Sequence, residues 1–229
     1  MILALETATA TGSVALFQET LVGEYTLSIQ RTHSERLLPA VVRILEDANV
    51  SPQDLSALAV SLGPGSFTGL RIGIMTAKTL AWSLDIPLLG IPTLDAMAWG
   101  MRYSQGLLCP LIDCRRGEAY CAFYLADGSS EPKRQTEYLS LPLVELEKKA
   151  EAYPGEKYWF GDVVFDLQKG IGVSGGLALP KAGSVAELAK KRLAKGEADD
   201  PLGMVPLYVR RSAARPRRVS LVSHSPDHS

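Results

Sequence analysis

The sequence predicts an α/β protein with two lobes, each built around a mixed sheet. Short apolar β runs come first and are followed by alternating helical and extended segments, an order typical of a mixed sheet covered by helices. The same order starts again near Gly106, which indicates a duplicated fold although no repeat is visible in the residues themselves. We expect a first lobe over residues 1–104, a smaller second lobe over 105–210 and a disordered tail over 211–229.

The composition is that of an ordinary globular protein and argues against several functional classes. Of the 229 residues, 46% are hydrophobic and 21% are charged, and the net charge of −1 provides no overall field to attract nucleic acid. The first residues carry no basic segment, and no apolar run approaches the ~20 residues that span a bilayer. Three cysteines without a CxxC pair argue against a disulfide framework. We therefore expect a cytoplasmic protein without membrane contact.

The first lobe is expected to begin with an antiparallel meander and to continue with helix–strand units. Strands are predicted at 2–5, 13–17, 21–28, 57–62 and 86–91, and helices at 33–47, 70–84 and 93–103. Thr32 and Glu35 have the spacing of a capping box at the start of the first helix. Apolar residues then recur at helical intervals, which makes this helix strongly amphipathic; they are Leu37, Leu38, Val41, Val42 and Leu45.

Residues 63–69 join an apolar strand to the long second helix. Glycines at 63, 65 and 69 break the apolar pattern, and Ser66 is placed to cap the helix. A phosphate cradle is one interpretation of such a turn. Because neither GxxxxGK[ST] nor GxGxxG is present, we favour a tight strand-to-helix turn whose glycines adopt unusual backbone angles.

Small residues recur at every fourth position of this helix, at Gly69, Gly73 and Ala77. They share one face, which allows another element to approach closely. Glycine inside a helix costs about 1 kcal/mol relative to alanine, so we expect something to pack there. The candidates are a second protein and, as the alternative, the chain's own sheet or first helix.

The second lobe is expected to begin as the first does, with consecutive β runs. Strands are predicted at 107–112, 118–125, 135–139 and 157–160, and helices at 143–150 and 184–195. Gly196 is placed to end the last helix. After Arg210 the sequence carries a basic cluster, which we expect to solvate the terminus, with contact to RNA phosphates as the alternative; it comprises Arg210, Arg211, Arg215, Arg217 and Arg218.

Candidate catalytic residues are few. Glu6 and Asp113 each end the first strand of a lobe, and two acids facing each other across a cleft would suit metal–phosphate chemistry. We treat this as the minority interpretation, because hydroxyl-rich turns such as the one after Glu6 are common for local reasons. His33 lies at the start of a predicted helix, whereas His224 and His228 lie in the predicted tail, and no pair has metal-ligand spacing. We therefore expect neither a catalytic set nor a metal site.

Four motifs resemble those of the bacterial TsaB family, also called YeaZ. They are LALETAT at 3–9, GPGSFTGLR at 63–71, IDCRRGE at 112–118 and PLYVR at 206–210, and the second is highly specific. The match extends over nearly the whole chain up to Arg210. The resemblance implies the duplicated fold of the actin/Hsp70/sugar-kinase (ASKHA) class. It also implies a part in making threonylcarbamoyladenosine (t6A), a modified base next to the anticodon of tRNAs.

The resemblance further implies that this family has a catalytic paralogue, TsaD, whose metal site includes an HxxxH motif. Thr93 and Met97 stand where those two histidines would be. Threonine is a poor metal ligand and a thioether prefers soft metals, so we expect this chain to hold no metal or other cofactor. Family members often carry Asp at the position of Glu6, and the longer side chain here puts a residual phosphate contact in doubt.

By the same resemblance, the chain is expected to bind a TsaD-like catalytic subunit, and to pair with a second copy of itself, through helices of the first lobe. The expected partner-binding residues are His33, Leu37, Leu38, Val41, Gly69, Gly73, Ala77 and Leu80. A TsaE-like ATPase is expected to join the assembly, and tRNA to be reached only through the complex. The alternative functions are a stand-alone ATPase or phosphotransferase that uses Glu6 and Asp113, and a metallopeptidase, which the missing ligands disfavour.

Overall fold

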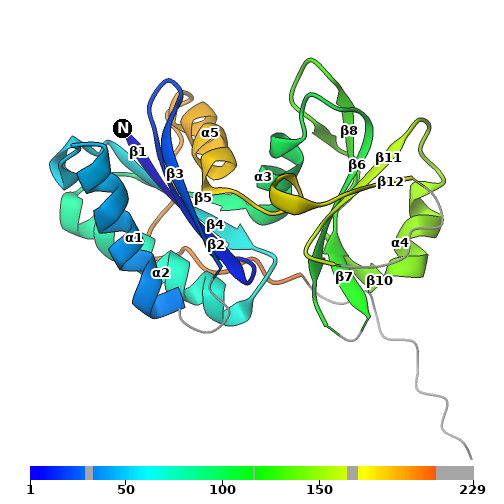
Figure 1. Ribbon diagram of the computed structural model, residues 1–229, viewed down its shortest axis with the longest axis horizontal. Coiled ribbons are helices and arrows are strands. Elements are labelled where there is room, and N and C mark those ends of the chain that lie inside the picture. The colour runs from blue at the N-terminus through cyan, green and yellow to red at the C-terminus, as the bar shows by residue number, and fades with distance from the viewer. Residues whose placement is uncertain (29–32, 116, 164–169, 210–229) are drawn as a thin grey trace, which may run out of the picture.

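The computed structural model describes residues 1–28, 33–115, 117–163 and 170–209. They form two sheets that lie side by side, each flanked by helices (Figure 1). The predicted tail over 211–229 lies outside the described residues. Among the helices within these ranges, none is both long enough and apolar enough to cross a bilayer.

The first sheet has five strands in the order β3-β2-β1-β4-β5. The strands are β1 (Ile2–Glu6), β2 (Thr11–Phe17), β3 (Leu21–Ser28), β4 (Ala57–Gly63) and β5 (Leu88–Pro92). The first three pair antiparallel, whereas β1, β4 and β5 run parallel, so the sheet is mixed as predicted. Central β1 is buried along its whole length, which explains why it is apolar rather than alternating.

Helices cover this sheet on both faces. The helices of the first lobe are α1 (His33–Asp47), α2 (Phe67–Leu84) and α3 (Thr93–Gly100), with a short 3₁₀ turn, η1, at Pro52–Asp54. The buried sides of α1 and α2 share one core with β1, β2 and β4. The two helices therefore lie together on one face of the first sheet (Figure 1).

The second sheet follows the order β10-β7-β6-β11-β12, with β8 and β9 attached beside β6. Its strands are β6 (Gln105–Asp113), β7 (Glu118–Cys121), β8 (Tyr124–Asp127), β9 (Lys133–Arg134), β10 (Leu139–Pro142), β11 (Lys157–Gly161) and β12 (Ile171–Val173). Its helices are α4 (Leu143–Ala150) and α5 (Ala182–Leu193), with a 3₁₀ turn, η2, at Gly175–Leu177. If the five strands in this order are numbered as they follow one another in the chain, the order is third, second, first, fourth, fifth, as in the first sheet. The parallel and antiparallel pairings of the two sheets also match. The duplicated fold is thus confirmed.

The last helix of each half packs on the other half. Apolar residues of α3 lie in a core with β6 and β8, whereas α5 lies against β1, β2 and β4. The segment after α5 also returns to the first sheet, because Asp199 forms an antiparallel bridge with Leu88. The expected division assigned all of 105–210 to the second lobe, whereas α5 and Asp199 pack on the first sheet. Packing of helices across the lobes leaves no local signal in the sequence, so it could not be expected from single segments.

Several elements differ from their predicted bounds. The strand predicted at 135–139, for example, lies at Leu139–Pro142. Two of the differences have identifiable reasons. The predicted strand 118–125 is interrupted between β7 and β8, where the Phe123 amide donates to the Thr136 hydroxyl at 3.1 Å instead of to a neighbouring strand. Helix α5 begins two residues earlier than predicted. The Ala182 amide donates to Ser13 Oγ at 2.9 Å and the Gly183 amide to Glu24 Oε1 at 3.0 Å, so side chains of the first sheet cap the helix.

Candidate functional site

The glycine-rich turn between β4 and α2 is locked onto the turn that follows β1. Ser66 caps α2 as predicted, because its Oγ accepts a hydrogen bond from the Gly69 amide at 3.2 Å. The Ser66 amide donates to the Ala8 carbonyl at 2.6 Å. A Cβ added at Gly65 would lie closer than 3.0 Å to Ala8, so the two turns are in direct contact. These contacts favour the strand-to-helix turn over a phosphate cradle.

The small-residue stripe of α2 faces the interior of the chain. Gly69, Gly73 and Ala77 are buried, and a Cβ added at either glycine would lie closer than 3.0 Å to an oxygen of Thr7. Ala77 belongs to the core shared by α1, α2 and the first sheet. The element that requires small residues is therefore the end of β1, and these three side chains present no surface to a partner.

The other expected partner-binding residues separate into buried and exposed sets. Leu37 and Val41 are buried in the same core, and Leu80 packs partly buried against it. Leu38 is exposed, and the side chain of His33 lies outside what the structure describes.

The prediction omitted further exposed apolar residues on the same two helices, namely Val42, Phe67, Met75 and Trp82. The sequence signal for the residues on α2 is that this helix is apolar on more than one side, and one of those sides faces outward.

The two candidate acids occupy very different environments. Glu6 is fully buried at the end of β1, with Oε1 accepting from the Ala8 amide at 2.5 Å. Burial raises the pKa of this carboxyl to about 7, since its hydrogen bonds do not offset the loss of water. Asp113 is exposed, and its Oδ1 accepts from the Arg115 amide at 2.8 Å. Within the described ranges, no hydrogen bond or ion pair joins Glu6 to Asp113, and no cluster of three or more His, Cys, Asp or Glu could hold a metal.

Thr93 and Met97 are both used for packing. The Thr93 hydroxyl is buried and accepts a hydrogen bond from the Gly63 amide at 3.1 Å, which ties α3 to the glycine-rich turn. Met97 is buried in the core between α3 and the second sheet. Neither side chain is free to bind a metal ion. The expectation that the chain carries no metal site stays a prediction.

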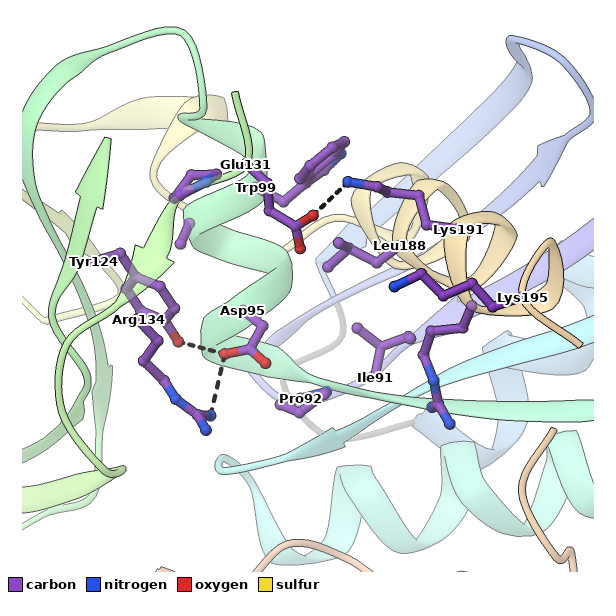
Figure 2. Close-up of a pocket in the computed structure, with 13 residues that line it drawn as sticks. Ile91, Pro92, Asp95, Trp99, Tyr124, Glu131, Arg134, Leu188, Lys191 and Lys195 are labelled. Carbon is purple, nitrogen blue, oxygen red and sulfur yellow. Dashed lines mark hydrogen bonds and ion pairs between the residues drawn. The ribbon is translucent and has the colours of Figure 1, made fainter. Parts of the chain in front are cut away.

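A cavity of about 320 Å³ lies between the two halves, bounded by α3, α5 and the β8–β9 region (Figure 2). Its charged residues are largely paired with one another. Lys191 bridges to Glu131 at 2.5 Å, and Asp95 accepts from the Tyr124 hydroxyl at 2.6 Å and lies 3.7 Å from Arg134. These contacts connect α3 and α5 to the second sheet, and they bring together no nucleophile with a base.

The duplicated mixed sheets, with their last helices exchanged, define a protein of the ASKHA class. A sequence-family model described as "TsaD: tRNA N6-adenosine threonylcarbamoyltransferase" matches residues 20–138. The tRNA threonylcarbamoyladenosine biosynthesis protein TsaB of Escherichia coli K12 is 35% identical, over 93% of this chain and 96% of that protein. TsaB of Bacillus subtilis 168 is 46% identical over 54% of each chain, about half the length of either protein. A solved structure of YeaZ from Pseudomonas aeruginosa has a TM-score of 0.78 at 29% identity, and the match covers 91% of this chain and 99% of that one. The chain belongs to the TsaB family.

Proposed function

We propose that this chain is a non-catalytic scaffold or activator subunit in tRNA t6A biosynthesis, and that it binds a TsaD-like catalytic subunit. The observation that carries the proposal is an exposed apolar surface on α1 and α2, which we call the pairing face. It consists of Leu38, Val42, Phe67, Met75 and Trp82. Large apolar side chains exposed on two helices that contact each other are typical of a protein–protein interface.

The arrangement of the pairing face fits a helical partner. Leu38 and Val42 are four residues apart on α1, and Met75 and Trp82 are seven apart on α2, so each pair lies on one side of its helix. Trp82 is 85% exposed and Met75 is 59% exposed. Large aromatic and thioether side chains such as these are enriched in interface cores. Because α1 and α2 lie on the same face of the first sheet, helices of a partner can pack against both.

The environment of the acids supports a role without catalysis. The Glu6 carboxyl is sealed beneath the two interlocked turns and is about half protonated at pH 7, given its pKa of about 7. The positions at which the resemblance implies a catalytic HxxxH are held by Thr93 and Met97, both buried. A stand-alone ATPase that uses Glu6 and Asp113 has less support, because Glu6 has no access to a nucleotide.

The proposal extends to the assembly around this subunit. By analogy with the family, a TsaE-like ATPase joins the complex and tRNA reaches this chain only through it. In the absence of the TsaD-like subunit, the same pairing face would allow two copies of this chain to associate. Such reuse is expected, since an apolar surface that binds one partner is exposed when that partner is missing.

The test is a charge placed in the pairing face. Met75→Asp should weaken binding of the TsaD-like subunit by at least about tenfold, as expected for an interface hot spot, and should leave the melting temperature nearly unchanged. Val144→Asp is the matched control, because Val144 is also exposed on a helix, α4, but lies in the other half. Binding would be measured by calorimetry and t6A formation in the reconstituted system. Unchanged binding by Met75→Asp would refute the proposed face.

A further inference from the structure

The segment after α5 runs back across the first sheet and along α2; we call residues 199–209 the C-terminal strap. Its first residue is held firmly. The Arg192 guanidinium donates to both carboxylate oxygens of Asp199 at 2.9 and 3.0 Å, and the Gly90 amide donates to Oδ2 at 2.7 Å. The hydrogen bonds from Arg192 keep the pKa of Asp199 below its usual value, so this anchor persists at neutral pH.

The rest of the strap is fixed to β4 and α2. Met204 is buried in the core of the first half, and the Lys78 ammonium donates to its carbonyl at 2.8 Å and to the Leu202 carbonyl at 3.4 Å. Farther along, the Leu207 amide donates to the Leu62 carbonyl at 2.7 Å. The strap therefore has a defined inner side, held by main-chain and side-chain contacts.

Its outer side is apolar and exposed. Leu202 is 91% exposed, Val205 64% and Tyr208 57%, and the three recur at every third residue. The Tyr208 ring lies 6.1 Å from the Phe67 ring at the start of α2. Exposed apolar side chains on a segment whose backbone is held in place are prepared for contact, because ordering them on binding costs little backbone entropy.

The strap borders the pairing face. Lys78, which holds it, is three residues from Met75 and four from Trp82, so the three side chains project within about 60° of one another around α2. The strap thus lies beside the exposed side of α2, and the Phe67–Tyr208 contact joins the two surfaces at one end.

We infer that the C-terminal strap is a third part of the pairing face and is covered by the TsaD-like subunit; this inference rests on the proposed function. The size of the surface supports it. A standard interface uses about 20–30 residues per partner. The described parts of α1 and α2 expose eight and seven residues, which is below this range when only fully exposed positions are counted. The strap adds five exposed residues, so the number of exposed residues reaches the lower end of that range. They are Asp200, Leu202, Gly203, Val205 and Tyr208.

The test uses the full chain with Leu202→Asp and Val205→Asp combined, titrated against the TsaD-like subunit. We expect the Kd to rise by at least about tenfold while the melting temperature stays within 1–2 °C of wild type, because both side chains are exposed. The milder pair Leu202→Ser and Val205→Ser covers the case in which the charged variant folds poorly, and should weaken binding less. Val144→Asp serves again as the control.

The outcomes separate the strap from the proposed function. If Met75→Asp weakens binding and the folded strap variants do not, the strap inference is overturned while the pairing face stands. If the wild-type chain does not bind the TsaD-like subunit, the proposed function and the inference both fail. If the strap variants reduce only self-association, measured by sedimentation, the strap is covered by a second copy of this chain and the inference is again wrong.

Discussion

Replacement of Gly73 by alanine tests where the small-residue stripe packs. In an ordinary helix interior this change stabilises the fold by about 1 kcal/mol. Here the added Cβ would lie closer than 3.0 Å to Thr7 Oγ1, with the Cγ2 and Cβ atoms of Thr7 at 3.2 and 3.3 Å. Because Thr7 is fully buried, it has little room to move. Overpacking of this kind costs roughly 1–3 kcal/mol, so we expect the sign of the effect to be reversed.

The measurement is urea denaturation together with a thermal melt, in which Gly73→Ala should lower the melting temperature by roughly 2–12 °C. Gly100→Ala is the matched control, because it adds a Cβ to a helical glycine at an ordinary 3.4 Å from Ser184 Oγ. Thr7→Ala in the Gly73→Ala background should recover much of the loss, a coupling that a double-mutant cycle detects. A Gly73→Ala variant at least as stable as wild type would refute the packing of the stripe on β1.

Two further predictions concern the acids. Because the folded-state pKa of Glu6 is raised to about 7, folding favours its protonated form. The contribution of Glu6 to the free energy of unfolding should therefore be fully present below pH 4.5 and should fall as the pH rises to 7, by on the order of 3 kcal/mol. Denaturation curves at pH 5 and 8 measure this contribution, and Glu6→Gln should remove it. A Glu6→Gln variant with the same pH profile as wild type would contradict the raised pKa of Glu6. Asp113→Ala should leave t6A formation within about twofold of wild type; a loss of the order of 100-fold, as expected for a catalytic group, would restore the enzyme hypothesis.

Most of the fold could be predicted because its signals are local. The apolar runs that become β1 and β4, and the helical spacing of apolar residues in α1, are visible within single segments. The exchange of α3 and α5 between the halves could not be predicted in this way. It depends on contacts between distant segments, such as the capping of α5 by Ser13 and Glu24.

The candidate partner-binding face stays a proposal, and local signals in the sequence indicate only some of its features. Periodicity identified the two helices and their buried sides, but a stripe of small residues indicates only that some element approaches closely. Whether that element is a partner helix or the end of a strand depends on the tertiary fold, and here it is Thr7. The exposed Met75 and Trp82 were obscured because a helix that is apolar on several sides looks the same whether a core or a partner covers it.

The interlocked turns link the burial of Glu6 to the position of α2. In this chain the Gly65 region fills the space next to Ala8, and α2 approaches Thr7 through Gly69 and Gly73. The contacts that seal Glu6 therefore also set the position of α2. The side chains that face away from this contact, Met75 and Trp82 among them, are thereby held at the surface on a rigid support. A rigid apolar face loses little entropy on association, which fits the proposed role of this chain as a scaffold subunit.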